Sequence, residues 1–243
     1  MTTSVRDEAQ LRSIAADGAA ALGADASAGD LMRWTANTFG SDFVVASNMQ
    51  DAVLIDVAAH HLDRAALDGA KLKVLFLDTG YHFAETIGTR DAAVQIYDLD
   101  LINVLPEQTV AEQDALLGRN LFASNPGECC RLRKVVPLKR TLAGYSAWVT
   151  GVRRVESPTR ANAPLISFDE TFGLVKINPL AAWTDDEFRA YIDTYGVLEN
   201  PLVAEGYPSI GCEPCTAKPA PGADARSGRW AGRAKTECGL HAS

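Results

Sequence analysis

Short and almost wholly apolar runs recur along the chain, and most are followed by a polar loop and a helical stretch. Phe43–Ala46, Leu72–Leu77 and Ala147–Thr150 are such runs, and residues 93–97 fit the same pattern. A strand buried on both sides has no polar face, so runs of this kind that alternate with helices predict a parallel sheet. The expected fold class is therefore α/β, with helices flanking a mostly parallel sheet.

The loops that follow the predicted strands are expected to meet. Ligands of open α/β sheets bind at the carboxyl ends of the strands. Loops 47–51, 78–81 and 151–160 should then gather at one edge. The predicted helices cover residues 7–22, 29–38, 52–62, 82–91, 129–143 and 184–196, with Asp30 and Thr184 as candidate caps.

The composition changes near residue 216. The segment that follows is rich in Pro, Gly, Ala and Arg and has little apolar periodicity, which is typical of a mobile tail. We expect an α/β domain over residues 1–216 and a flexible tail over 217–243. The N-terminus is charged and no apolar run reaches about 18 residues, so a cytoplasmic location without a membrane span is expected.

Charge is concentrated in one block. The chain has a formal net charge of −8, yet residues 129–160 hold eight basic side chains and one acidic side chain. The acidic balance opposes general nucleic-acid binding. The basic block indicates either a pocket for a small anion or the solvated face of a helix.

The five cysteines give the strongest chemical signal. Cys129 and Cys130 are adjacent, Cys212 and Cys215 form a Cys-x-x-Cys pair, and Cys238 stands alone. Two pairs suit a metal centre. Zinc sites use wider spacings than an adjacent pair, whereas separate irons of an iron–sulfur cluster can each take one of two neighbouring thiolates. An iron–sulfur cluster, a zinc site and unligated buried thiols all stay open on spacing alone.

Cys238 lies in the predicted tail, where a packing role is not expected. It is either a free surface thiol or a nucleophile that the tail delivers into a pocket, with His241 and nearby basic residues favouring the thiolate. The loop from Ser47 to Asp51 follows a strand and precedes a helix, as a phosphate site would. It has neither the G-x-x-x-x-G-K-[ST] nor the G-x-G-x-x-G pattern. His82 is expected to be structural or on the surface.

Six motifs occur together in order from about residue 40 to the C-terminus: SNMQD, LDTGYHF, CCRLRK, GVRR-x-x-SPTR, the Cys-x-x-Cys pair and ECGLH. In this combination the chain resembles the assimilatory sulfonucleotide reductases. It is most similar to the branch that reduces adenosine 5′-phosphosulfate (APS), because the branch for 3′-phospho-APS (PAPS) usually lacks both cysteine pairs. The resemblance implies an adenine-nucleotide hydrolase-like fold, thioredoxin as reductant and often a homo-oligomer.

The resemblance also implies roles for individual residues. Cys129, Cys130, Cys212 and Cys215 match the ligands of a [4Fe–4S] cluster. Cys238 matches the nucleophile, His241 the histidine of the tail, and Lys134 the lysine between cluster and substrate. The substrate positions are Ser47, Asn48, Asp51, Leu77, Asp78, Thr79, Gly151, Arg160, Arg226 and Arg229. Family loops often have a glycine where this chain has Asn48.

The implied reaction begins with attack of Cys238 on the sulfur of APS, which releases AMP and leaves an S-sulfocysteine. Thioredoxin then expels sulfite. The cluster is expected to act electrostatically and structurally, because thioredoxin supplies both electrons. The alternatives are a PAPS reductase, an iron–sulfur tRNA-thiolating enzyme and a non-catalytic iron–sulfur sensor.

Overall fold

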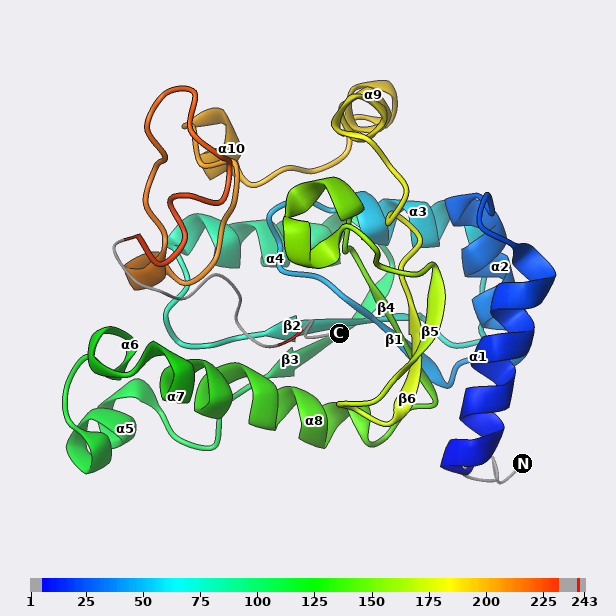
Figure 1. The fold of residues 1–243 in the computed structure, drawn as a ribbon, viewed down its shortest axis with the longest axis horizontal. Coiled ribbons are helices and arrows are strands. Elements are labelled where there is room, and N and C mark those ends of the chain that lie inside the picture. The colour runs from blue at the N-terminus through cyan, green and yellow to red at the C-terminus, as the bar shows by residue number, and fades with distance from the viewer. Residues whose placement is uncertain (1–5, 232–239, 241–243) are drawn as a thin grey trace.

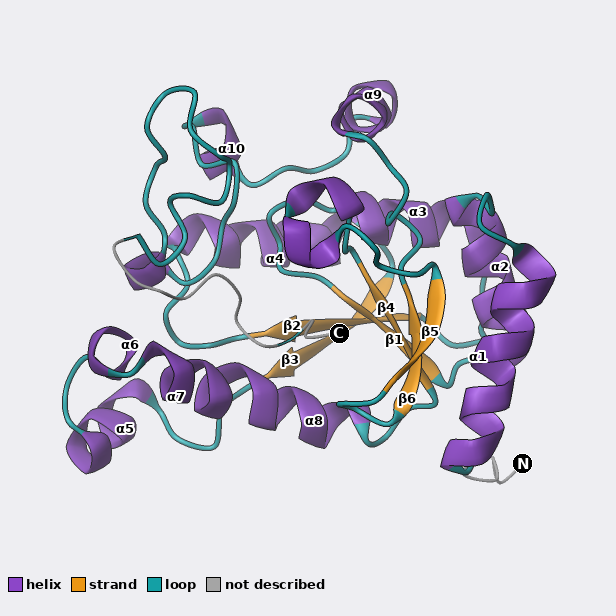
Figure 2. Ribbon diagram, viewed as in Figure 1, coloured by secondary structure: helices purple, strands orange, loops and turns teal. Residues whose placement is uncertain are grey.

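The computed structural model describes residues 6–231 and residue 240. This part of the chain folds around a six-stranded sheet in the order β3-β2-β1-β4-β6-β5 (Figures 1 and 2). The strands are β1 Phe43–Ala46, β2 Leu72–Leu77, β3 Leu99–Val104, β4 Ala147–Thr150, β5 Ile166–Asp169 and β6 Leu174–Ile177. Only β5 runs antiparallel to its neighbour, so the mostly parallel sheet that the sequence predicts is confirmed.

The order in which strands are added to the sheet reverses at β1. From β1 the chain passes to β2 and β3 on one side, and later returns to place β4 on the other side, with Val45 in register with both Val74 and Val149. Connections that leave neighbouring strands in opposite directions open a crevice at their carboxyl ends. The loops after β1 and β4 flank this crevice.

Helices cover both faces of the sheet (Figure 2). The longer ones are α1 Glu8–Leu22, α2 Ala28–Phe39, α3 Val53–His61, α4 Ala84–Ile96, α5 Val110–Leu117, α8 Val136–Leu142 and α9 Asp185–Tyr195. Short helices are α6 Leu121–Ser124, α7 Pro126–Cys130 and α10 Pro201–Ala204. Among the described residues no helix is long and apolar enough to span a membrane.

Period-two alternation along the strands sends apolar side chains to both faces. Val44, Leu75 and Trp148 pack with Leu138 and Leu142 of α8. The alternate residues of the same strands pack with α1, α2 and α3 in the larger cluster. Full burial on both faces explains why the central strands read as continuous apolar runs.

The third predicted strand is wrong. Residues 93–97 form the end of α4 and its cap, where the Tyr97 N–H donates to the Ala93 carbonyl at 2.9 Å. The strand at this edge of the sheet is β3, whose exposed Asp100 resembles a loop residue in the sequence. An edge strand keeps one side in solvent and so lacks the apolar run that marks β1 and β2.

The cap assigned to the second helix also needs correction. Ser27 is the N-cap of α2, and its hydroxyl accepts from the backbone N–H of Asp30. The Asp30 carboxylate, at the third position of the helix, accepts the backbone N–H of Ser27 in turn, which makes a capping box. Thr184 caps α9 as predicted. The sequence did not predict α5, β5 or β6.

The predicted basic helix over residues 129–143 consists of α7, a π-helical turn at Arg131–Val135 and α8. The Val136 N–H donates to the carbonyl of Arg131, five residues earlier. Pro137 provides a physical reason, because proline donates no hydrogen bond and its ring crowds the carbonyl four residues before it. A wider turn at this point relieves both constraints.

Candidate active site

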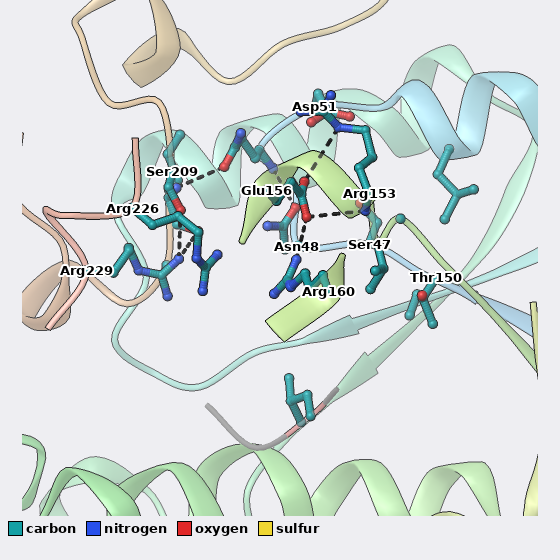
Figure 3. Close-up of a pocket in the computed structure, with 18 of the residues that line it drawn as sticks. Ser47, Asn48, Asp51, Thr150, Arg153, Glu156, Arg160, Ser209, Arg226 and Arg229 are labelled. Carbon is teal, nitrogen blue, oxygen red and sulfur yellow. Dashed lines mark hydrogen bonds and ion pairs between the residues drawn. The ribbon is translucent and has the colours of Figure 1, made fainter. Parts of the chain in front are cut away.

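A cavity of about 600 Å³ occupies the crevice at the carboxyl ends of β1, β2 and β4 (Figure 3). Its walls include the loops after these strands, the start of α9 and the segment that leads to the Cys-x-x-Cys pair. The predicted substrate residues that line it are Ser47, Asn48, Asp51, Leu77, Thr79, Gly151, Arg160, Arg226 and Arg229. A volume of this size fits a nucleotide-sized ligand.

The loop after β1 makes a tight turn. The Met49 N–H donates to the Ser47 hydroxyl at 3.2 Å, and the Gln50 N–H donates to the Asn48 side-chain oxygen at 3.2 Å. Met49 has a φ of 58° and its side chain is fully buried. The turn therefore exposes Asn48 to the cavity while Met49 anchors the loop in the core.

Asp51 ends this loop at the start of α3. Its carboxylate accepts the Val53 N–H at 3.0 Å, which satisfies a donor of the first helical turn. Burial raises the pKa of Asp51 to about 6, and the nearby Glu156 acts in the same direction, while Arg153 opposes the shift. Asp51 thus borders the cavity as a weakly acidic group that also holds the helix terminus.

The predicted substrate residues at the end of β2 differ in whether they border the cavity. Leu77 and Thr79 border the cavity, whereas Asp78 does not belong to its lining. The Asp78 carboxylate accepts from the Gly80 N–H at 3.1 Å and lies 3.4 Å from the guanidinium of Arg90. The structure therefore places Asp78 as a brace of the turn beside the site.

Cationic side chains gather around the cavity from distant parts of the chain. Arg226 and Arg229 enter from one wall, and Arg160 lies beside Asn48 (Figure 3). Arg160 forms an ion pair with Glu156. Arg229 donates to the Ser209 hydroxyl at 3.3 Å and to the Ile210 carbonyl at 3.1 Å. A cavity lined by fixed guanidinium groups favours an anionic ligand.

Arg153 and His82 are among the lining residues that were not predicted as site residues. Arg153 is 12% exposed, pairs with Asp185 at 2.8 Å and stacks over the Phe188 ring at 4.3 Å. His82 borders the cavity, and its Nε2 lies 2.7 Å from the Leu77 carbonyl. Burial lowers the pKa of His82, and Lys134 adds to the effect. Arg153 belongs to the predicted loop 151–160, so its position in the basic block was an available signal.

The two cysteine pairs meet at a second, small cavity beside the first. Cys129, Cys130, Cys212 and Cys215 line it together. All four are thiols rather than halves of disulfides, and the first three are buried. Burial, followed by the proximity of the other three thiols, raises the pKa of Cys129 to about 12. The hydroxyl of Thr79 lies 3.2 Å from the Cys212 sulfur.

This donor set suits a group with several metal atoms. Four thiols within electrostatic reach of one another, three of them buried, cannot all ionise without a compensating cation. Within the described ranges, no three His, Cys, Asp or Glu side chains are placed to share a single metal ion. Thiols spread around a small cavity fit a cluster in which each iron takes its own thiolate.

Lys134 borders both cavities. It lies on the π-helical turn four residues after Cys130, so a single helical segment supplies a pair of thiols and the lysine. Arg133, also on this turn, is 3% exposed and donates to the Thr79 carbonyl and to Gln113 Oε1 at 3.1 Å. Arg133 thereby fastens the turn to the loop after β2.

Residues 217–231 return to the body of the domain. Trp230 is 2% exposed and borders both cavities, and Thr216 forms a β-bridge with Arg229. Leu240 packs against the apolar face formed by β1, β2 and α8, and it also lines the large cavity. Cys238 and His241 lie outside the described residues. The predicted mobility of the tail stays a prediction.

Comparison with known proteins agrees with this geometry. A phosphoadenosine phosphosulfate reductase domain matches residues 42–218. The chain is similar to proteins named adenosine 5′-phosphosulfate reductase from Mycobacteroides abscessus (68% identical; 99% of this chain, 98% of the relative) and Rhodococcus opacus (63%; 97% and 96%). The chain therefore belongs to the phosphoadenosine phosphosulfate reductase domain family. Its relatives at 63–68% identity place it in the APS reductase branch.

Solved structures resemble the fold. A phosphoadenylyl-sulfate reductase from Candida auris, solved as a phosphate complex, superposes with a TM-score of 0.68 at 25% identity, covering 89% of this chain and all of that chain. A Candida glabrata FMN adenylyltransferase with FAD and pyrophosphate gives a TM-score of 0.57 at 14% identity, with 89% and 75% covered. The second likeness concerns the fold alone. The adenine-nucleotide hydrolase-like fold is confirmed.

Proposed function

We propose that this protein reduces APS to sulfite and AMP with thioredoxin as reductant. The observation that carries the proposal is the contact between two cavities through Lys134, one lined by guanidinium groups and one by four thiols. A polyanionic nucleotide fits the first cavity. The curated relatives that share nearly the whole chain are named for APS.

Binding uses the fixed cations of the cavity. APS has a phosphate joined to a sulfate through an anhydride oxygen, and both groups are anionic at neutral pH. Arg160, Arg226 and Arg229 provide planar donors for these oxygens, and Lys134 provides a compact charge on the side of the cysteines. Ser47 and Asn48 supply further polar groups to the lining of the cavity.

The first chemical step is nucleophilic substitution at sulfur. The thiolate of Cys238 attacks the sulfate sulfur, an S–S bond forms, and the S–O bond to AMP breaks with its electron pair on the AMP oxygen. Leu240, two residues later, lines the cavity, and two peptide units span less than about 8 Å. This short connection supports delivery of Cys238 to the same cavity. Positive charge at Lys134 and the arginines stabilises the negative charge that develops on the leaving group.

The second step transfers the electrons. A thiolate of reduced thioredoxin attacks the Cys238 sulfur, and sulfite leaves with the electron pair of the broken S–S bond. The second thioredoxin thiol then attacks the mixed disulfide and regenerates the Cys238 thiolate. Sulfur falls from the +6 to the +4 oxidation state while the two thioredoxin thiols become a disulfide. His241 is proposed to assist as a tail residue near the reacting thiol.

Cys129, Cys130, Cys212 and Cys215 would hold a [4Fe–4S] cluster. When bound, such a cluster would supply a compact charged group beside Lys134 and would join α7 to the Cys-x-x-Cys segment. Electrons for the reaction come from thioredoxin, so this role is electrostatic and structural. An EPR signal that disappears and returns with each turnover under assay conditions would contradict it.

Product formation tests the proposed function. Anaerobically purified protein is incubated with reduced thioredoxin and either APS or PAPS, and sulfite and AMP are quantified. We expect equal amounts of sulfite and AMP from APS, a much lower rate from PAPS, and no product with Cys238→Ser. Preference for PAPS would assign the chain to the other substrate, and product from Cys238→Ser would remove the nucleophile. Light scattering tests whether it forms the homo-oligomer that family members often form.

A further inference from the structure

The peptide from Pro208 to Ile210 is held by two side chains from different parts of the chain. The Gln50 amide donates to the Pro208 carbonyl at 3.2 Å and accepts the Ile210 N–H at 2.9 Å. Arg229 donates to the Ile210 carbonyl at 3.1 Å and to the Ser209 hydroxyl at 3.3 Å. The Gln50 side chain therefore pairs with a backbone N–H and a C=O group of this peptide as a neighbouring strand would. Arg229 binds the Ile210 carbonyl and the Ser209 hydroxyl.

The backbone of Gln50 belongs to the substrate loop. Its N–H donates to the Asn48 side chain at 3.2 Å, and its carbonyl accepts the Asn200 N–H at 2.9 Å. The Asn200 side chain is buried and donates to the Met49 carbonyl at 3.1 Å. The turn that exposes Asn48 is thus rigidly connected to the residue that grips the 208–210 peptide.

The 208–210 peptide continues directly into the cysteine site. Gly211 follows it, and the Gly211 N–H donates to the Thr216 hydroxyl at 3.2 Å, which in turn donates to the Cys212 carbonyl at 2.9 Å. A shift of this peptide would move Cys212 and the hydrogen-bond partners of Arg229 together. The Gln50 side chain therefore connects the substrate loop to Arg229 and to the Cys212–Cys215 segment.

We propose that Gln50 is a positioning residue, which acts through the 208–210 peptide to fix Arg229 and the Cys212–Cys215 segment relative to the substrate loop. This inference rests on the proposed function for its ligand. Removal of the amide leaves the Pro208 carbonyl and the Ile210 N–H without a protein partner. Arg229 then loses its fixed direction, and binding of an anionic nucleotide weakens. Gln50→Glu keeps the acceptor for Ile210 but lacks the donor for Pro208, so its effect should be smaller.

Equilibrium binding of APS in a Cys238→Ser background, which cannot turn over, tests the proposal. We expect Gln50→Ala to weaken APS binding about tenfold, Gln50→Glu to have an intermediate effect, and Gln95→Ala, at an exposed position of α4, to have none. Gln50 is proposed to act through Arg229. The double variant Gln50→Ala/Arg229→Ala should therefore bind APS with an affinity within about twofold of that of Arg229→Ala alone. If the losses of APS affinity from the two single substitutions multiply in the double variant, Gln50 has a role separate from Arg229, and the inference is overturned.

Hydrogen exchange in the ligand-free protein gives a second readout. Gln50→Ala should accelerate exchange at the amides of Ile210 and Cys212 at least about tenfold, while Gln95→Ala leaves them unchanged. Unchanged exchange at both amides would refute the coupling even if APS binding fell. If the Cys238→Ser parent binds no APS, the proposed function fails, and the exchange result alone decides the role of Gln50.

Discussion

Replacement of Gly211 by alanine should damage the site without damaging the fold. An ideal Cβ at this position would lie 2.1 Å from Nη2 and 2.5 Å from Cζ of Arg229. Ordinary contacts between heavy atoms need about 3.5 Å, so the guanidinium must move by roughly 1 Å or more. The guanidinium ends a flexible side chain and can move, which keeps the cost in folding stability small.

The displacement has a calculable effect on substrate binding. Arg229 would lose its hydrogen bonds to Ile210 and Ser209, now 3.1 and 3.3 Å long, because hydrogen bonds weaken steeply beyond about 3.5 Å. A displaced guanidinium also loses its aligned contact with the anion, and a charged hydrogen bond contributes about 1.5–3 kcal/mol. We therefore expect APS to bind Gly211→Ala about 10- to 100-fold more weakly.

The assay is the KM for APS in the sulfite-release reaction, measured beside the melting temperature. Gly88→Ala is the matched control, because no atom of the described residues outside its own helix lies within 4 Å of the ideal Cβ. Alanine in this helix should raise stability by up to about 1 kcal/mol and leave the KM unchanged. A parental KM for Gly211→Ala would refute the assigned packing of Arg229, and so would an equal loss of affinity in both variants.

Three further predictions concern stability and charge. Burial raises the pKa of Asp51 to about 6, from 3.8, so the folded state binds this proton more tightly and stability falls as pH rises from 4 to 6. At pH 8, Asp51→Asn should be more stable than the parent by up to about 3 kcal/mol, and near pH 3.5 the two should be equally stable. Urea unfolding at both pH values measures this, and a stability difference that is the same at both pH values would contradict it. Asn200→Ala leaves the Met49 carbonyl unpaired and should lower stability by about 1–3 kcal/mol, and an unchanged urea midpoint would contradict the anchoring role. Lys134→Ala should lower kcat/KM for APS at least about 100-fold while iron content stays constant, and loss of iron would instead assign the lysine to cluster binding.

The central strands were predictable because burial on both faces leaves a simple apolar pattern. The edges of the sheet were not: the start of β3 was placed six residues too early because Ala93 and Val94 belong to the buried side of a helix. The β5–β6 hairpin has short strands with charged residues such as Asp169 and Lys176, which pair with each other at 3.7 Å inside the fold. Asp169 and Lys176 lie in strands because of these tertiary contacts, which the local sequence pattern does not reveal.

The site shows a similar division. Family motifs indicate which loops approach the nucleotide, and nine of the ten predicted substrate residues line the cavity. The direction of a side chain depends on neighbours that the sequence does not identify, so Asp78 turns to Arg90 while Arg153 enters the cavity. Likewise, the sequence predicted one continuous helix over residues 129–143, but the chain forms a π-helical turn at Arg131–Val135.

Mass spectrometry of anaerobically purified protein after addition of APS without reductant tests the central claim most directly. The proposed mechanism predicts one sulfonate adduct on Cys238, formed with release of AMP and removed by reduced thioredoxin with release of sulfite. Addition of PAPS should give little adduct. An intact enzyme that forms no adduct with APS, or one that forms it on another cysteine, would contradict covalent catalysis by Cys238.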